Sequence, residues 1–283
     1  MADSLIVLDF DGTMTDAEAE AGPFREGYLD DIATLAGLPR AEVEALAARF
    51  DAEVAAHPER EGWRFYGHIV APATVDPYLR IMPVARRILD AAGVLQDEVV
   101  RTRLLDGVLY KHNYPRTRTV FRPGAADLLQ ALLPRSAWVV TNSHTEAVAH
   151  KIALLDATVD GTLAAWQGRV RGRARKYELD ADWQGAPASM ALPGLPRPVL
   201  LRRRAYFEVL DGLRRGAGLD WSEVCVVGDI FELDLALPWA LGARVGLLAN
   251  AHTPPWERAF FQDAPRAVIL NDLPAAGRWL LGG

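Results

Sequence analysis

Several short runs of apolar residues, each ending in polar or turn-forming residues, most strongly limit how this chain can fold. The first run, SLIVLDF at 4–10, is followed by others at 137–141, 169–174, 198–201, 224–229, 243–248 and 267–270. Such runs are typical of strands that are buried on both faces of a sheet. Apolar residues at helical spacing lie between most of them. This alternation predicts an α/β fold, with a parallel sheet and helices on both of its faces.

The stretch from residue 15 to residue 120 has a different pattern. It is rich in alanine and glutamate, repeats apolar residues at helical spacing and contains no clear strand. The chain has 283 residues, enough for more than one domain. We therefore predict a Rossmann-like core formed by residues 1–14 and 121–283, with a helical domain, residues 15–120, inserted into it.

Composition and charge exclude several classes of protein. Hydrophobic residues make up 50% and charged residues 24%, as in ordinary soluble domains, and the net charge of −6 argues against a protein that mainly binds nucleic acid or anionic membranes. The single cysteine, Cys225, excludes an internal disulfide. No apolar stretch reaches the roughly 18 residues that span a bilayer, and the N-terminus lacks a cleavable leader. We expect a cytoplasmic monomer or homodimer whose partner is a small molecule.

Acidic residues directly follow two of the predicted strands. Asp9 and Asp11 end the first run and precede Gly12, while Asp229 and Asp234 follow the run that begins at residue 224. Ligands of open α/β sheets bind at the carboxyl ends of the strands, so we expect these carboxylates to lie close together. A few carboxylate oxygens, with positions left for water and phosphate, suit Mg²⁺.

Polar residues also follow the predicted strand at 137–140. Thr141, Asn142 and Ser143 lie where a helix begins, so a hydroxyl group and free backbone N–H groups meet at the positive end of that helix. This arrangement predicts a phosphate site, although the hydroxyl groups could equally cap the helix. Glu232, at the start of a later helix, is interpreted as an acid favoured there by the helix dipole.

Three strings, DFDGTMTD at 9–16, VVTNS at 139–143 and VVGDIFELD at 226–234, together resemble the motifs of the haloacid dehalogenase-like (HAD) hydrolase superfamily. Each follows an apolar run, and together they span the predicted core. The resemblance implies that Asp9 is the nucleophile that becomes an aspartyl-phosphate and that Asp11 is the general acid and base. It also implies that Thr141 and Asn142 bind the phosphate.

The same resemblance implies a Mg²⁺ site. Asp229 would complete this site with Asp9 and the backbone carbonyl of Asp11, and Asp234 would support it directly or through water. Asp11 also bears on the reaction, because expelling a halide needs no proton and dehalogenases of the family generally lack an acid at this position. We therefore expect magnesium-dependent hydrolysis of the phosphate monoester of a small metabolite.

Members of the family carry a further cation that offsets the charge of the nucleophile and holds the phosphate. We expect Lys176 in this role, because it shares the apolar face of the predicted strand at 169–176 while the arginines of that strand face outwards. The usual proline after this lysine is replaced by Tyr177. The alternatives lie between the run at 198–201 and the next helix: Arg202, Arg203 and Arg204.

The inserted helical domain resembles the cap of the family, which closes over the site and selects the substrate. Aromatic and basic residues in it could line the substrate site or form its own core: Trp63, Arg64, Phe65, Tyr66, His68, Tyr110, Lys111 and Tyr114. Two other functions stay open. A phosphotransferase or sugar-phosphate mutase would pass the phosphoryl group to another hydroxyl, and a non-catalytic phosphate-binding protein could share the fold. The outward arginines at 169–175 could bind an anionic polymer, but a solvated strand face is expected.

Overall fold

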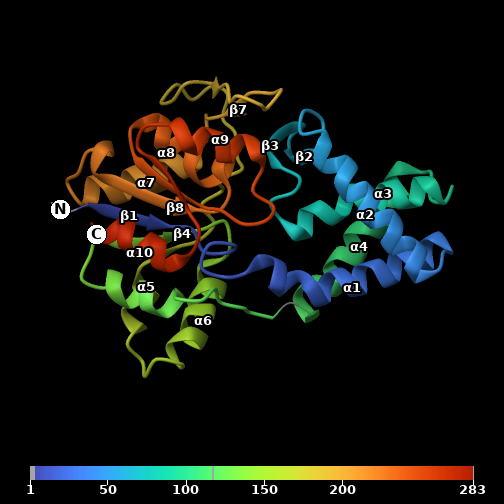
Figure 1. Ribbon diagram of the computed structural model, residues 1–283, viewed down its shortest axis with the longest axis horizontal. Coiled ribbons are helices and arrows are strands. Elements are labelled where there is room, and N and C mark those ends of the chain that lie inside the picture. The colour runs from blue at the N-terminus through green and yellow to red at the C-terminus, as the bar shows by residue number, and fades with distance from the viewer. Residues whose placement is uncertain (1–3, 117, 283) are drawn as a thin grey trace. The chain divides into compact units, whose positions relative to one another are not determined.

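A six-stranded parallel sheet is the centre of one part of the molecule. The computed structural model describes residues 4–116 and 118–282, without the side chains of residues 110 and 113–115. The sheet has the order β10-β9-β8-β1-β4-β5 and runs through the middle of this part in Figure 1. Its strands are β1 (Leu5–Leu8), β4 (Ala137–Val140), β5 (Val170–Arg171), β8 (Val224–Gly228), β9 (Arg244–Leu248) and β10 (Ala267–Leu270).

The register of the central strands determines where their loops meet. Leu8 at the end of β1 lies opposite Val139 of β4 on one side and Val227 of β8 on the other. The backbone N–H of Asp9 donates to the carbonyl of Val227 at 2.8 Å. The loops that follow β1, β4 and β8 therefore begin at one edge of the sheet, as expected for parallel strands.

Helices cover both faces of the sheet, which confirms the predicted α/β class. On the face of Ile6 and Leu8 pack α5 (Ala125–Leu132), α6 (Thr145–Asp156) and α10 (Leu273–Leu281). On the face of Leu5 and Val7 pack α7 (Arg204–Gly216), α8 (Ala236–Leu241) and α9 (Pro255–Asp263). Short helical turns lie at Ala164–Gly168, Trp221–Glu223 and Phe231–Leu235. The side chains of β1 alternate between two apolar layers and are all buried.

The helices of the inserted stretch form a separate compact unit with its own apolar core. They are α1 (Ala17–Ala36), α2 (Arg40–Ala56), α3 (Pro77–Ala91) and α4 (Glu98–Arg116). The core includes Phe24, Tyr28, Ile32, Val84 and Ile88. The unit comprises residues 17–63 and 72–120, and we refer to it as the helical unit; the remainder is the sheet unit. None of the helices in the described residues is both long and apolar enough to cross a bilayer.

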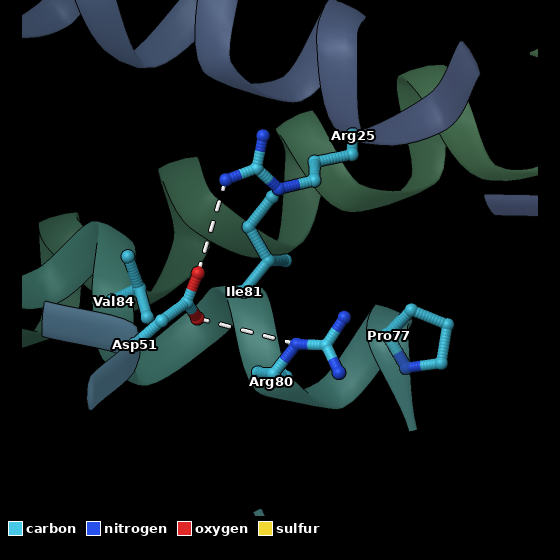
Figure 2. A pocket seen from close by; sticks show the side chains of 6 residues that line it. All are labelled: Arg25, Asp51, Pro77, Arg80, Ile81 and Val84. Atoms are coloured by element: carbon cyan, nitrogen blue, oxygen red, sulfur yellow. Dashed lines mark ion pairs between the residues drawn. The ribbon is translucent and has the colours of Figure 1, made fainter. Parts of the chain in front are cut away.

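Charged side chains inside the helical unit are paired with one another. Figure 2 shows a small pocket in which Asp51 lies 3.8 Å from Arg25 and 4.0 Å from Arg80. Arg80 also forms a two-point ion pair with Glu18, at 3.0 and 2.7 Å. The pocket has room for about one water molecule, so we assign it no ligand.

Two strands occur between residues 15 and 120, where none was predicted from the sequence. β2 (Gly62–Phe65) and β3 (His68–Pro72) form a hairpin, and residues 64–71 of it belong to the sheet unit. The turn is made by Tyr66 and Gly67, both with positive φ (45° and 82°), as two-residue hairpin turns require. The side chains of β2 are partly exposed and neither strand forms a continuous buried apolar run, so the prediction of a stretch without strands was wrong here.

The proline-rich stretch at 183–198 is mostly irregular. A short strand within it, β6 (Ser189–Met190), pairs in antiparallel fashion with β7 (Val199–Leu200), which follows it. Edge strand β10 is preceded by Arg266, a non-glycine residue with a φ of 63°. The remaining strand prediction that failed, at 169–176, bears on the site and is described below.

Candidate active site

The turn after β1 lies close to the loop after β8, so that carboxylates of both loops meet at the edge of the sheet. Gly12 has a φ of 84°, and a Cβ atom there would lie 2.2 Å from Oδ2 of Asp229. Only glycine therefore allows the turn to approach Asp229 so closely. Thr13 connects the two loops, because its hydroxyl lies 3.0 Å from Oδ2 of Asp9 and 3.3 Å from Oδ1 of Asp229. The sequence analysis gave Thr13 no role.

Asp9, Asp229 and Asp234 form a buried cluster of carboxylates. Their ligand atoms lie within 4.8 Å of one another, and their exposed fractions are 7%, 4% and 3%. Gly228 makes room for Asp234, since a Cβ atom there would lie 2.5 Å from the Cβ of Asp234. Burial raises the pKa of Asp9 to about 7, against the opposing effect of Lys176. Burial and the neighbouring carboxylates of Asp9 and Asp234 raise the pKa of Asp229 well above its usual range.

Lys176 lies inside this cluster, where the sequence analysis expected the cation. Its Nζ is 2.7 Å from Oδ1 of Asp9 and 2.8 Å from Oδ1 of Asp234, and the side chain is 1% exposed. The ring of Tyr206 lies beneath the ammonium group, 5.5 Å from Nζ to the ring centre. Burial opposes the charge, but the carboxylates of Asp234 and Asp9 outweigh it and raise the pKa of Lys176. Asp234 thus pairs with the lysine, a contact that its expected role near the metal did not include.

The segment that carries Lys176 is not the continuous strand that was predicted. Strand β5 ends at Arg171, because Arg173 and Arg175 adopt left-handed conformations with φ of 53° and 50°. The alternation of buried and exposed side chains persists all the same: Ala174 and Lys176 are buried and both arginines are exposed. Left-handed backbone at two non-glycine residues is sterically costly, and hydrogen bonds from neighbouring loops compensate for it.

Thr141 and Asn142 hold this segment in place. The N–H of Ala174 donates to the carbonyl of Thr141 at 2.9 Å, and the N–H of Lys176 donates to Oδ1 of Asn142 at 2.8 Å. The hydroxyl of Thr141 accepts a hydrogen bond from the N–H of Ser143 at 3.1 Å within the loop. Helix α6 begins at Thr145 with His144 at its N-cap and has no side-chain cap hydrogen bond, so the capping alternative was wrong. Both residues therefore support the backbone around Lys176, and their binding of phosphate stays a prediction.

The three alternative arginines bond elsewhere. Arg202 donates to the carbonyl of Ala181 and to Gln184, while Arg204 pairs with Glu208 at 2.8 Å. Arg203 is fully buried, and its guanidinium donates to backbone carbonyls at Leu200, Lys176 and Val70. Burial lowers its pKa to about 10. Arg203 is thus connected to Asp9 only through Lys176, because it binds the backbone carbonyl of that lysine.

Asp11 lies apart from the buried cluster and has its own partners. Its Oδ2 accepts a hydrogen bond from the hydroxyl of Ser143 at 2.6 Å, and its Oδ1 accepts one from Nζ of Lys151 at 2.8 Å. The sequence places Lys151 inside a helix and shows no role for it. Ser143 lies before that helix, so the spacing between the two residues follows no helical period.

Two further residues near the motifs have partners that the sequence did not predict. Glu232 was interpreted as an acid at a helix start, but it is fully buried and forms a two-point ion pair with Arg197, at 2.8 and 2.6 Å. A buried carboxylate without such a partner would be costly, and this pairing explains its position better than the helix dipole does. His144 lies 3.0 Å from Nη2 of Arg173 through its Nδ1.

Comparison with known proteins bears on the fold. No protein-family model and no curated protein matches the chain. Solved structures do match it. A HAD-hydrolase from Bacillus subtilis, bound to magnesium, aligns with 13% identity and a TM-score of 0.55 over 100% of both chains. A haloacid dehalogenase-like protein of unknown function from Agrobacterium tumefaciens aligns with 14% identity and a TM-score of 0.51, over 99% of this chain and 98% of its own.

A third structure, described as a predicted phosphoglycolate phosphatase from Haemophilus somnus, aligns with 17% identity and a TM-score of 0.52 over 99% of this chain and 98% of its own. The chain has the haloacid dehalogenase-like fold. The fold expected from the three sequence strings is thereby confirmed. In this HAD fold the loops after β1, β4 and β8 carry the strings that suggested it.

The buried cluster has the charge and chemistry to hold a divalent cation. Asp9, Asp229 and Asp234 carry three negative charges when ionised, and Lys176 is the cation paired with them. The remaining excess of two negative charges in a buried region is costly unless protons or a cation compensate for it. The raised pKa values of Asp9 and Asp229 correspond to compensation by protons. For compensation by a cation, a hard divalent ion such as Mg²⁺ fits the oxygen donors of these carboxylates.

Proposed function

We propose that this protein is a magnesium-dependent hydrolase of phosphate monoesters of small metabolites, which acts through an aspartyl-phosphate on Asp9. The proposal rests on one observation: Asp9 and Asp11 lie only two residues apart in the sequence, but their side chains lie in different surroundings. Asp9 is buried against Lys176, while Asp11, which is bound by Ser143 and Lys151, keeps 34% of its side-chain exposure. A nucleophile and a general acid need such different surroundings, because one must be ionised and the other must exchange a proton.

Asp9 would supply the attacking oxygen. Phosphoryl transfer depends mostly on positioning and on neutralising charge. Lys176 holds Oδ1 of Asp9, and the hydroxyl of Thr13 lies at Oδ2, so the carboxylate has a fixed orientation. Asp9, Asp229 and the backbone carbonyl of Asp11 would hold Mg²⁺, with Asp234 in support, and the ion would offset the charge of the phosphate oxygens.

Asp11 would perform the proton transfers. As the oxygen of Asp9 bonds to phosphorus and the ester bond breaks, Asp11 gives its proton to the departing alkoxide oxygen. In the second half, Asp11 takes a proton from the water whose oxygen attacks phosphorus, and the bond from phosphorus to Asp9 breaks. The products are the alcohol and inorganic phosphate, and both carboxyl groups return to their starting states.

The experiment that tests this function measures the turnover of 4-nitrophenyl phosphate and of a panel of alkyl phosphates, with and without Mg²⁺. We expect Mg²⁺-dependent release of phosphate, and a loss of at least about a thousandfold in kcat for Asp9→Asn, which keeps the shape of the side chain. Asp182→Asn is the matched control, because Asp182 is an exposed aspartate outside the site.

The results separate the alternatives. Turnover that survives Asp9→Asn would show that another group is the nucleophile. If no ester of the panel is hydrolysed in the presence of Mg²⁺, the hydrolase proposal is wrong. Ester consumption with little free phosphate, and with the phosphoryl group found on a second alcohol, would identify a phosphotransferase instead.

A further inference from the structure

The partners of Asp11 come from the loop after β4 and from the helix that follows it. Ser143 lies in the loop after β4, and Lys151 lies in the middle of α6. Each gives one hydrogen bond to a different oxygen of the same carboxylate, at 2.6 and 2.8 Å. The chain has only three lysines, and the structure places two of them on carboxylates that follow β1, Lys176 on Asp9 and Lys151 on Asp11.

The backbone next to Asp11 is also fixed. The N–H of Gly12 donates to the hydroxyl of Thr15 at 3.3 Å, and Nε of Arg122 donates to the carbonyl of Gly12 at 2.9 Å. Asp11 retains 34% of its side-chain exposure and Lys151 retains 20%. The side chain of Asp11 is thus fixed at the adjacent backbone and at its carboxylate, and it is still reachable from solvent. A group that exchanges protons with a substrate must be reachable in this way.

We propose that Lys151 and Ser143 are positioning residues for Asp11 and that they determine whether the enzyme can hydrolyse esters of poor leaving groups. This inference rests on the proposed phosphatase function. A general acid transfers its proton only when it lies within hydrogen-bond reach of the leaving oxygen. The two hydrogen bonds from α6 and its preceding loop remove the free rotation that would otherwise carry the carboxyl group out of that reach.

The leaving group decides how much this positioning contributes. An alkoxide is strongly basic and departs only as it is protonated, so the ester of a simple alcohol depends fully on Asp11. The 4-nitrophenolate ion is weakly basic and departs without a proton. Loss of Lys151 or Ser143 should therefore slow alkyl phosphate hydrolysis far more than aryl phosphate hydrolysis.

The test compares kcat for ethyl phosphate and for 4-nitrophenyl phosphate in the full-length protein with Mg²⁺. The variants are Lys151→Met, which keeps the length of the side chain without its charge, Ser143→Ala and Lys151→Arg. General acid catalysis contributes about 10²- to 10⁴-fold, so we expect Lys151→Met to lower kcat for ethyl phosphate by about 10- to 100-fold and kcat for the aryl ester by less than about threefold. We expect Ser143→Ala to act in the same direction and Lys151→Arg to restore most of the alkyl activity.

Arg215→Met is the matched control, because Arg215 is an exposed helical cation paired with Asp211 in the sheet unit. It should leave the ratio of the two rates unchanged. A purely structural role would lower both rates together in Lys151→Met and Ser143→Ala, and that result would overturn the inference. A rise in KM for both esters with unchanged kcat would also overturn it, because the lysine would then bind substrate. Wild-type protein that hydrolyses neither ester would instead overturn the proposed function, and the inference with it.

Discussion

A buried lysine in the candidate site is shared by two aspartates. Lys176 touches Asp9 and Asp234 at nearly equal distances and has a tyrosine ring beneath it. A lysine with 1% exposure stays charged only because such partners offset its loss of water. The same contacts keep two neighbouring carboxylates from repelling each other when both are ionised.

Lys176→Met should therefore affect both activity and stability at neutral pH. We expect kcat for 4-nitrophenyl phosphate to fall by at least about a hundredfold and the free energy of unfolding to drop by about 3–5 kcal/mol, because two buried carboxylates lose their counter-charge. Urea unfolding and steady-state kinetics measure the two effects. Arg202→Met, which removes one of the alternative arginines, should change kcat little; a comparable loss in that variant would contradict the assignment.

At this scale the sequence predicted the residues that follow strands and missed those that reach the site from elsewhere. Asp9 and Asp229 follow apolar runs directly, and Lys176 lies on the buried side of an alternating segment, so linear patterns located all three. Lys151 and the ring of Tyr206 come to the site only through the fold, and Thr13, although it lies in the same loop as Asp9, shows its contact with Asp229 only in the structure. Nothing in their immediate neighbours distinguishes them from a turn threonine, a helix-surface lysine and a core tyrosine.

At the scale of elements, a buried arginine connects the hairpin of β2 and β3 to the segment that carries Lys176. Arg203 donates to the carbonyl of Val70 at 2.9 Å and also to the carbonyl of Lys176. The ring of Phe65 in the same hairpin packs on Tyr177 with ring centres 5.0 Å apart. The hairpin is therefore part of the sheet unit although its neighbours in sequence are helical.

Arg203→Met should loosen this hairpin selectively. The variant leaves three backbone carbonyls without their donor, each at a cost of about 1–3 kcal/mol when it stays buried. We expect faster amide hydrogen exchange in a peptide covering residues 62–72 and no change in peptides from α1 and α2, measured by mass spectrometry. Arg204→Met, an exposed neighbour, is the control. Uniformly faster exchange across the chain would show that the arginine supports the whole fold rather than the hairpin.

Burial rather than length separates the strands that the sequence predicted from those that it missed, since β1 and β2 both have four residues. The strands β1, β4 and β8 are visible as apolar runs because nearly all of their side chains are buried. β2 and β3 have mixed, partly exposed side chains, and β5 ends after two residues where Arg173 turns left-handed. Such features depend on contacts with distant segments, and no local pattern in the sequence specifies them.

For the whole molecule, the buried acids make stability depend on pH and metal. An acid whose pKa is higher in the folded than in the unfolded protein binds more protons when folded, so stability falls as pH rises between the two values. Asp9 has its pKa raised from 3.8 to about 7 by burial, and the raised pKa values of Asp229 and Glu257 act in the same direction. The metal-free protein is thus expected to lose stability between about pH 4 and pH 7.

Thermal unfolding at a series of pH values tests this dependence without any assay of activity. We expect Asp9→Asn to flatten the decline in Tm and to be more stable than the wild type at pH 8 without metal, since one unit of pKa shift corresponds to about 1.4 kcal/mol. Mg²⁺ at millimolar concentration should raise the Tm of the wild type more at pH 8 than at pH 5.5, because the ion competes with protons for the carboxylates. An equal rise at both pH values, or the same rise in Asp9→Asn, would contradict a metal site at this cluster.

The limits of the two compact units lie close to the places where the sequence pattern changes, apart from the hairpin. A change from apolar runs to helical periodicity near residue 15, and back near residue 121, matches the limits of the two units at 16–17 and 120–121. The return of residues 64–71 to the sheet unit was not predictable, because it depends on Arg203, more than 130 positions later, and on a ring contact with Tyr177.

The left-handed arginines have a consequence for how this protein behaves at high concentration. A sheet can recruit a strand from another chain at either open edge, provided that the edge is extended and flat. Here one edge is β5, which stops where Arg173 and Arg175 turn the backbone away, and the other is β10, which begins just after Arg266 in the same conformation. Each edge thus carries a charged residue and a bend where a foreign strand would have to pair. Both edges of the sheet are in this way poor templates for a strand of another chain, which should disfavour self-association into fibrils.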